Sequence, residues 1–486
     1  MIYKEIIKAK NGAKIPIFAD GKSFHSKYNP EREACQLVQN TEKSDFFLVT
    51  GLGAAFHVKE LQNKFPEAFI LVVENSENDI EFLESISGTK NVFNKNTKIC
   101  TLENLEENLQ KFYLPAKYST FSVFAINSWL LQINKNFFLE KINSALKKIS
   151  ADFSVQAHFG KIWQTNILNN LKFANREKKF IIPEEKICLI CAAGPSLDEK
   201  IEFIKKNRGK YYILATDTAF KTLSAENIFS DAVISIDGQM ISYSHFTGKI
   251  NPKTLFIFEL MANHSAVKKV RKHTENFLFT VSSHPFEQIL SLSDKNAFFQ
   301  TDSTSGTVTI AALDFAKNAG FADIEIFGAD FGYLNNKAYA KGTYLDRINY
   351  SKETRISSAE KEFSKLMFRT ELINVSKNKK TTGTLKFYEE NLFLWCKKNA
   401  CRIEKYDNSY KIRNFSKEKK EVKNMPFDTK FFFRQLKNME NSTQVETALL
   451  PYISWLKNNT KNAQNIPFNE YTKLALNFIL RYNLEI

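Results

Sequence analysis

Glycine and proline are scarce in this chain: its 486 residues include 16 Gly and 11 Pro. Flexible or extended linkers are rich in these residues, so we expect no long interdomain linker. The chain also lacks an uninterrupted apolar run of about 18 residues, which a membrane-spanning helix needs. Residues 1–14 lack the apolar core and the small-residue cleavage site of a signal peptide. Together these absences predict a cytoplasmic protein without a membrane span.

The cysteines and histidines form no disulfide or metal pattern. The six Cys are scattered rather than spaced as a disulfide framework. Cys188 and Cys191 make a C-x-x-C within the apolar run ICLICAAG, but no second C-x-x-C or His pair stands at ligand spacing. The seven His include no H-x-H or H-E-x-x-H pair. We therefore predict no metal centre and assign the two cysteines to a buried strand.

A dense basic tract is absent, although the chain is basic overall. Lys and Arg total 68 and Asp and Glu 53, which gives a formal net charge of +15. That sign favours anionic partners. The charge is spread thinly, because Lys and Asn are frequent throughout, as in proteomes biased towards A/T-rich codons. A nucleotide ligand is therefore favoured over nucleic acid.

What is present is an ordinary globular composition, with 43% apolar and 25% charged residues. At about 150 residues per domain, the length predicts about three domains. The first ordered pattern is a strand at 46–50, a turn with Gly51 and Gly53, a helix at 54–64 and a strand at 68–74. This is one βαβ unit.

The glycine turn of this unit resembles that of a dinucleotide or S-adenosylmethionine fold, with the acidic Glu74 ending the second strand. In the G-x-G-x-x-G pattern, however, the third small position falls on the bulky Phe56. We therefore favour a structural Rossmann-like unit over a cofactor site here.

A second α/β segment begins at Lys186, where apolar strands alternate with helical patterns. This alternation predicts an α/β fold with a central doubly wound, mainly parallel sheet. We find no internal repeats. The predicted domains are an N-terminal Rossmann-like domain at 1–117, a helical connector at 118–182, a central nucleotide-sugar-binding catalytic domain at 183–373 and a C-terminal helical region at 374–486.

The candidate site residues of the central domain follow the predicted strands, because ligands of open parallel sheets bind beyond the carboxyl ends of the strands. Two helix starts suit phosphate groups, and aspartates there hold ribose hydroxyls, a base edge or a divalent metal. The candidates are Gly194, Pro195, Ser196, Asp217, Asp237, Thr304, Ser305, Gly306, Asp330, Tyr333 and Tyr339. Taken singly, each polar residue is equally explained as a helix cap. Several at successive strand ends favour a nucleotide or nucleotide-sugar site.

These segments resemble the motility accessory factor (Maf) family of flagellin glycosyltransferases. The resemblance covers roughly 25–400 and is carried by CAAGPSLDEKIEFIKK, ILATDTAFKTL, DAVISIDGQ, STSGTVTIAALDFAKNAG, DIEIFGADFGY and AYAKGT, with HSKYNPEREA, TGLGAAFHVKEL and FGKIWQTNILNNL upstream. The central region of this family is also named for the archaeal hydroxymethylpterin pyrophosphokinase. It is similar to bacterial sialyltransferases that use CMP-activated nine-carbon acidic sugars.

The sialyltransferase resemblance implies a role for each candidate. The turn at 194–196 contacts the nucleotide, as does the helix start at 304–306. Asp217 and Asp237 stand where the family has asparagines that contact the nucleotide. Tyr333 and Tyr339 stabilise the leaving phosphate, and with Asp330 they form the candidate catalytic set.

The chain departs from the sialyltransferase pattern at two places. Asp302 replaces the arginine before the T-S-G helix start, and no histidine follows His284, so the catalytic histidine beyond the tyrosines is missing. The general base is therefore unassigned.

Three functions remain open. The resemblance implies transfer of an acidic nonulosonic sugar from a CMP donor to Ser or Thr of flagellin, in support of flagellar assembly and motility. Mg²⁺ is compatible with this hypothesis but not required. The first alternative is an ATP- and Mg²⁺-dependent pyrophosphokinase-like enzyme with Asp217, Asp237 and Asp330 as metal or nucleotide ligands. The second is a non-catalytic flagellin-binding factor, which the missing Arg and His favour. The sequence carries no signal for the oligomeric state.

Overall fold

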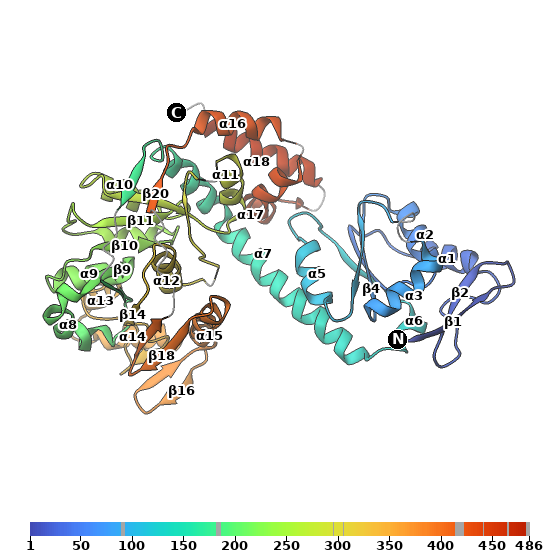
Figure 1. Ribbon diagram of the computed structural model, residues 1–486, viewed down its shortest axis with the longest axis horizontal. Helices are drawn as coiled ribbons and strands as arrows, with labels where there is room; N and C mark the ends of the chain where they lie inside the picture. Colours follow the sequence, from blue (N-terminus) through green and yellow to red (C-terminus); the bar gives the residue numbers. More distant parts are fainter. Residues whose placement is uncertain are drawn as a thin grey trace. The chain divides into compact units, whose positions relative to one another are not determined.

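The computed structural model describes residues 1–88, 93–180, 186–294, 296–304, 306–413, 422–440, 442–463 and 466–482. The chain forms two compact units. Figure 1 labels their helices and strands and colours the chain from the N-terminus to the C-terminus. The N-terminal unit comprises Met1–Gly160 and Leu450–Leu474, and the central unit comprises Lys161–Leu449 and Ala475–Ile486. The sequence instead predicted boundaries after residues 117, 182 and 373. The difference arises because helix α7 (Lys135–Leu171) is a single helix of 37 residues whose two parts belong to different units.

The N-terminal unit contains a four-stranded parallel sheet in the order β5-β4-β3-β6. Its strands are β3 (Phe46–Thr50), β4 (Phe69–Glu74), β5 (Thr97–Thr101) and β6 (Phe121–Phe124). Every residue of β3 and β4 is buried, as expected for strands covered on both faces. A hairpin of β1 (Tyr3–Lys8) and β2 (Lys14–Phe18) precedes them. The strand–turn–helix–strand pattern predicted at 46–74 is thus confirmed.

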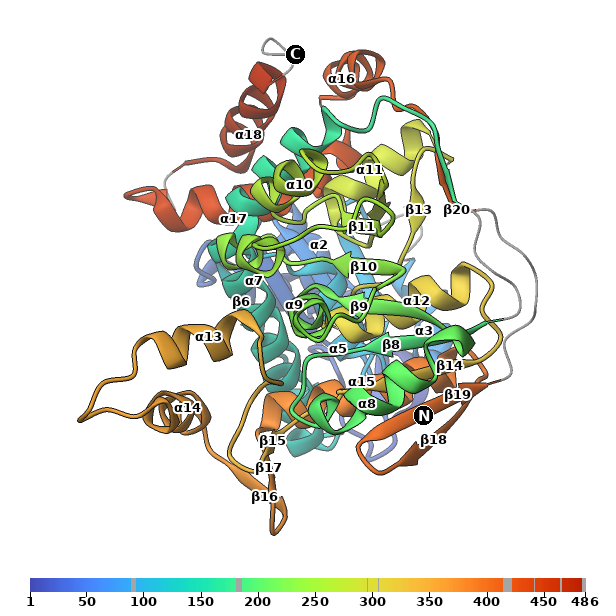
Figure 2. The same ribbon diagram turned by 90° about the vertical axis from the view of Figure 1, so that its left-hand side faces the viewer.

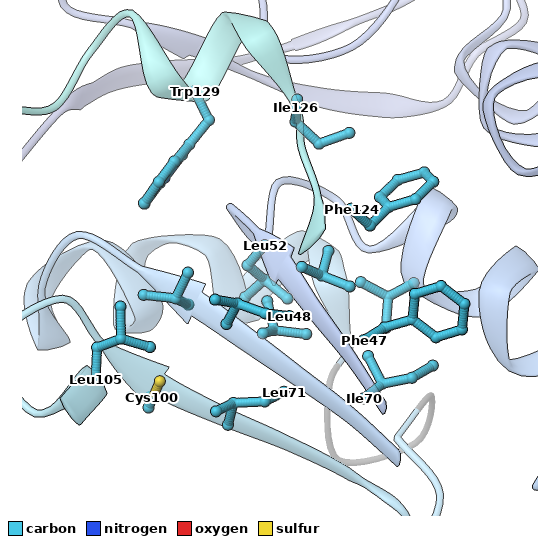
Figure 3. Close-up of a cluster of buried hydrophobic side chains, with 14 of the residues drawn as sticks. Phe47, Leu48, Leu52, Ile70, Leu71, Cys100, Leu105, Phe124, Ile126 and Trp129 are labelled. Carbon is cyan, nitrogen blue, oxygen red and sulfur yellow. The ribbon is translucent and has the colours of Figure 1, made fainter. Parts of the chain in front are cut away.

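Helices of the N-terminal unit enclose an aromatic-rich core. They are α1 (Pro30–Gln39), α2 (Phe56–Lys64), α3 (Glu77–Ser87), α5 (Leu105–Phe112) and α6 (Asn127–Leu130). Figure 3 shows part of this core, with Trp129 projecting from α6 towards the strands that carry Leu48 and Leu71.

The central unit is built on a nine-stranded sheet in the order β13-β12-β11-β10-β9-β8-β14-β19-β18. Figure 2 shows β14, β8, β9, β10 and β11 side by side. The parallel strands are β8 (Ile187–Cys191), β9 (Tyr211–Thr216), β10 (Ala232–Ser235), β11 (Leu255–Glu259), β12 (Phe277–Val281), β13 (Phe299–Gln300) and β14 (Ile324–Phe327). The chain leaves β8 towards β9 and later returns to its other side as β14, so a topological switch point lies between β8 and β14.

Both faces of this sheet are covered, which confirms the predicted doubly wound α/β arrangement. Cys188, Ile190 and Leu214 share a core cluster with α12 (Val308–Asn318). Successive residues of a strand point to opposite faces, so Phe256 of β11 lies on the other face, where its ring meets Phe220 of α9 in an edge-on contact. The further helices of this sheet are α8 (Leu197–Lys206), α9 (Asp217–Ala225), α10 (His264–Arg271) and α11 (Pro285–Ser293), with the 3₁₀ segments η1 (Arg208–Lys210) and η2 (Met240–Phe246).

The region from residue 374 onwards was predicted to be helical, and its described residues include four helices. They are α15 (Gly383–Lys398), α16 (Thr429–Asn438), α17 (Thr443–Asn459) and α18 (Phe468–Tyr482). The region also contributes strands, and this differs from the prediction. The hairpin of β18 (Arg402–Tyr406) and β19 (Ser409–Arg413) extends the central sheet, with β19 antiparallel to β14. In this hairpin the alternation of apolar and polar residues is short and includes charged residues. Its buried Tyr410 and Ile412 pack in the same core as Trp395 of α15.

The remaining elements of the central unit are small. A three-stranded sheet consists of β15 (Tyr333–Leu334), β17 (Lys379–Thr381) and β16 (Ile373–Ser376), and β20 (Val422–Asn424) pairs with β7 (Lys178–Phe180). Helices α13 (Tyr344–Ser351) and α14 (Ala359–Met367) lie between β15 and β16 in the sequence. Within the described residues, no helix combines the length and the apolar character that crossing a membrane requires.

Candidate functional site

A cleft of about 360 Å³ lies at the carboxyl ends of β8, β9 and β14, at the switch point of the central sheet. We call it the central cleft. Five of the predicted site residues line it: Gly194, Gly306, Asp330, Tyr333 and Tyr339. Its other lining residues with a hydroxyl group are Thr216, Thr218, Thr307, Thr309 and Tyr388. The central cleft therefore combines tight backbone turns with many hydrogen-bonding side chains, as ligand sites of parallel sheets do.

The floor of the central cleft is formed by two glycine turns that touch. The Gly194 amide donates to the Gly328 carbonyl at 2.7 Å. A Cβ on Gly194 would lie 2.3 Å from Asp330 Oδ2, and one on Gly328 would lie 2.2 Å from the Ala192 carbonyl oxygen. Glycine is therefore required at both positions because there is no space for a side chain.

Asp330 joins the turn after β14 to the start of α8. Its side chain is buried, and Oδ2 accepts a hydrogen bond from the Ser196 amide at 2.9 Å. Oδ1 has no partner among the described residues. Burial raises the pKa of Asp330, whereas the hydrogen bonds from Ser196 and the positive charge of Lys379 lower it. The result is an oriented carboxyl group, more basic than an exposed aspartate, with one oxygen unused.

Tyr333 and Tyr339 lie in the loop after β14 and line the central cleft together. Burial raises the pKa of both phenols, and for Tyr339 the neighbouring Tyr333 and Asp217 add to this effect. A raised phenol pKa means that both hydroxyls keep their protons at neutral pH. Both tyrosines can therefore donate hydrogen bonds to an anion in the cleft.

Four other predicted residues do not line the central cleft. Pro195 and Ser196 begin the turn into α8, and the Ser196 amide is engaged by Asp330. Asp217 is buried, where Oδ1 accepts from the Thr218 amide at 2.7 Å and Oδ2 from Ser235 Oγ at 2.6 Å. Asp237 is half-buried and accepts from the Gln239 amide at 2.9 Å. Burial and the charge of Asp217 raise the pKa of Asp237, so the two aspartates are electrostatic neighbours.

The second predicted helix start is displaced along the sequence. The helix begins at Val308, and its N-cap is Thr307, whose Oγ accepts from the Ile310 amide at 3.2 Å. Thr304 precedes the helix and donates its amide to Asp302 at 3.0 Å, and it does not line the cleft. Ser305 lies outside the described residues. Gly306 has φ = +75° and faces Tyr388 across the cleft, where a Cβ on this glycine would lie 3.5 Å from the ring.

Several residues that line the central cleft were not predicted from the sequence. Thr216 and Thr218 flank Asp217 at a strand end, so the same rule that selected the aspartate would also have found them. Leu385 and Tyr388 come from α15, more than 50 residues beyond Tyr333, and no local pattern in the sequence links them to the cleft.

The glycine turn of the N-terminal unit is filled by side chains. A Cβ on Gly51 would lie 2.6 Å from the rings of Phe24 and Trp129, and one on Gly53 would lie 2.6 Å from Phe24 and His25. The buried Glu74 accepts from Trp129 Nε1 at 2.6 Å, from the Leu52 amide at 2.9 Å and from the Tyr3 hydroxyl at 3.1 Å. These contacts support the interpretation of this unit as structural, because protein groups occupy the position of a cofactor's pyrophosphate and ribose.

Comparisons with known proteins place the fold and the family. Residues 164–336 match the family model described as 6-hydroxymethylpterin diphosphokinase MptE-like. One uncharacterized protein of Treponema pallidum (strain Nichols) is 32% identical over 228 residues, covering 46% of this chain and 75% of the relative. Another from the same strain is 36% identical over 171 residues, covering 32% of this chain and 81% of the relative. This chain belongs to their family.

The structural comparison extends over the whole chain. The structure of the Maf glycosyltransferase from Magnetospirillum magneticum AMB-1 matches 100% of this chain and 86% of its own, with a TM-score of 0.53 and 11% identity. At that identity the match establishes the fold, and the predicted resemblance to Maf proteins is confirmed at this level. The segment that matches the MptE-like model ends after Tyr333, so Tyr339 and Tyr388 of the central cleft lie beyond it.

Proposed function

We propose that this protein is a glycosyltransferase that moves an acidic nonulosonic sugar from a CMP donor to Ser or Thr hydroxyls of flagellin. One observation carries the proposal: in a chain with the fold of a Maf glycosyltransferase, an open cleft at the switch point brings together the glycine floor, Asp330 and two protonated tyrosines. On this proposal the protein acts in the cytoplasm, with flagellin and the nucleotide sugar as its partners, and supports flagellar assembly and motility.

The leaving group needs stabilisation in this reaction. The bond between the anomeric carbon of the sugar and a phosphate oxygen of CMP breaks, and its electron pair remains on the phosphate. The hydroxyls of Tyr333 and Tyr339 donate hydrogen bonds to that oxygen as its charge grows. Phenol hydroxyls are protonated at neutral pH, so both tyrosines have a proton to donate.

The acceptor hydroxyl needs a base, and Asp330 fits this role. As the acceptor oxygen bonds to the anomeric carbon, its proton passes to Asp330 Oδ1, which has no partner in the described structure. The Ser196 amide holds the other oxygen and thereby orients the carboxylate. Asp330 would thus replace the histidine that this chain lacks.

On this proposal, the remaining predicted residues act mainly by positioning neighbouring residues. Asp217 fixes Thr218, which lines the cleft, and the turn at 194–196 lets the nucleotide approach the backbone closely. Asp237, Thr304 and Gly306 would contact the nucleotide, as the sialyltransferase resemblance implies. Mg²⁺ is compatible with this arrangement but not required by it.

The match to a diphosphokinase family model favours a second candidate, an ATP- and Mg²⁺-dependent pyrophosphokinase-like enzyme. It would use Asp217, Asp237 and Asp330 as nucleotide or metal ligands. Both oxygens of Asp217 already accept hydrogen bonds from protein groups, so this carboxylate is not free to bind a metal or a nucleotide. These contacts favour the glycosyltransferase.

Calorimetry and a transfer assay separate the candidates. We expect CMP to bind without Mg²⁺ and more tightly than ATP, and we expect sugar to move from CMP–N-acetylneuraminic acid or a related CMP-nonulosonate to flagellin. Binding of ATP only with Mg²⁺ would establish the pyrophosphokinase-like enzyme. Binding of flagellin without nucleotide binding or transfer would establish the non-catalytic flagellin-binding factor.

A further inference from the structure

A second cavity of the central unit, of about 140 Å³, is lined by positively charged side chains. Lys221 comes from α9, Lys249 from the loop after η2 and Arg347 from α13. Ser224, Thr247 and the buried His245 complete the polar lining, and none of the lining residues is Asp or Glu. We call this cavity the cationic pocket.

The charges of the cationic pocket are not neutralised by carboxylates. In the part of the chain that the structure describes, no ion pair includes Lys221, Lys249 or Arg347. Lys221 Nζ donates to the neutral Thr247 hydroxyl at 2.9 Å. Burial and repulsion from Arg347 lower the pKa of Lys221. An anion bound here would relieve this repulsion.

His245 adds an unsatisfied polar group to the same lining. Its side chain is only 8% exposed, and its Nδ1 has no hydrogen-bond partner among the described residues. Its ring meets Tyr344 of α13 edge-on. A buried polar atom without a partner costs free energy, so a ligand that supplies a hydrogen-bonding group gains from binding here.

Helix α9 lines both the cationic pocket and the central cleft, because Thr218 lines the cleft and Lys221 lines the pocket. Three residues of helix span about 4.5 Å along its axis, a distance that one ligand can bridge.

We propose that the cationic pocket is an oxyanion subsite, which holds the carboxylate of an acidic sugar whose nucleotide, with its phosphate, occupies the central cleft. This inference rests on the proposed function. A guanidinium fork and ammonium groups suit a planar carboxylate. The pocket would thereby select donors that carry a further negative charge.

Calorimetry on the full-length protein tests the proposal with CMP–N-acetylneuraminic acid and with CMP. The variants are Lys221→Gln and Arg347→Gln, and Lys206→Gln on the exposed face of α8 is the control that removes the same charge elsewhere. Circular dichroism and melting temperatures establish that each variant is folded. We expect both pocket variants to bind the sugar nucleotide about tenfold more weakly, as for the loss of a charge-assisted hydrogen bond, and the control to bind normally.

The two ligands distinguish the source of the oxyanion. Weaker binding of the sugar nucleotide with unchanged binding of CMP would support the carboxylate subsite, and an equal loss for both ligands would overturn it. Unchanged binding of both ligands in both variants would overturn the subsite. If the wild-type protein binds neither ligand, the proposed donor fails, and inorganic phosphate then decides the subsite. If phosphate raises the melting temperature of the wild type but not of Arg347→Gln, the oxyanion subsite is retained. If phosphate does not stabilise the wild type, the subsite is rejected.

Discussion

The two units of this protein use the same device, a parallel strand followed by a glycine turn and a helix, with opposite results. In the N-terminal unit, Gly51 and Gly53 have φ values of +79° and +52°, and aromatic rings from elsewhere in the unit occupy the space that they leave. In the central unit, Gly194 packs against Gly328 and Asp330, and the turn opens into the central cleft. Side chains crowd the glycines in both units, so a glycine turn at a strand end is a candidate binding site only where it also lines a cavity.

The buried carboxylates of the two turns differ in the same way. Glu74 accepts hydrogen bonds from the main chain and from two aromatic side chains, so its oxygens are satisfied. Asp330 has one oxygen held by Ser196 and the other without a partner in the described structure. A satisfied carboxylate holds a core together, whereas the carboxyl group of Asp330, which lines the cleft with one oxygen unsatisfied, is the candidate for chemistry on the proposed function.

The largest effect should come from Asp330→Asn. The amide oxygen can still accept from the Ser196 amide, but the group no longer takes a proton, so we expect transfer to slow by about 10³-fold. The melting temperature and the affinity for CMP should change little. Transfer rates with flagellin as acceptor measure this effect, and a rate within threefold of the wild type would remove Asp330 from the chemistry.

Tyr333→Phe and Tyr339→Phe should each slow transfer by about 10²-fold, the scale for losing one donor to a developing charge. The rings are retained, so CMP affinity should be nearly unchanged. Tyr350→Phe on α13 is the matched control, since Tyr350 is exposed and does not line the cleft. Full activity in both cleft variants would make these tyrosines structural and would favour the flagellin-binding factor.

Trp129→Phe should destabilise the N-terminal unit without changing the affinity of the central unit for CMP. The change removes the Nε1 donor to the buried Glu74, so we expect the free energy of unfolding to fall by about 2 kcal/mol. The affinity of the folded protein for CMP should be unaffected, because the ligand binds in the other unit. Denaturant unfolding and calorimetry measure the two quantities, and a parallel loss of CMP affinity would place a ligand in the N-terminal turn after all.

The smallest effect concerns pH and a second buried carboxyl group of the central unit. Burial raises the pKa of Glu259 from 4.5 to about 7. Because the folded pKa exceeds the unfolded one, the folded state binds more protons between pH 4.5 and pH 7, and stability is lost as pH rises through this window. Glu259→Gln should therefore be more stable than the wild type at pH 8 and differ little from it at pH 4.5.

Glu74→Gln provides the contrast in the N-terminal unit. Burial also raises the pKa of Glu74 to about 7, but its oxygens face several donors, so an amide NH₂ would meet another donor. Glu259 accepts a hydrogen bond from the Ser303 hydroxyl, and its Oε2 has no hydrogen-bond partner among the described residues, so an amide is tolerated there. Melting temperatures at both pH values should fall for Glu74→Gln. Similar behaviour of the two variants would contradict the difference between the two carboxylates.

The sequence was a good guide to local structure. The strands at 46–50 and 187–191 followed from apolar runs between turn residues, and the rule that ligands bind at strand ends selected Gly194, Asp330 and Tyr333, which line the cleft. It was a poorer guide where a strand-end residue has a local partner. Asp217 looked like a ligand for a nucleotide, but Ser235 and Thr218 satisfy its carboxylate.

By itself, the sequence determined the alternation of strands and helices and the places where the chain turns, because these depend on neighbouring residues and on backbone freedom. Only the tertiary structure decided which turn is open. Trp129 closes the first turn from more than 70 residues away, and Tyr388 completes the second from a helix that no local pattern links to it. The β18–β19 hairpin likewise gains its place in the sheet only by pairing with β14. Space filling and strand pairing join residues distant in the chain, so they are absent from any local pattern.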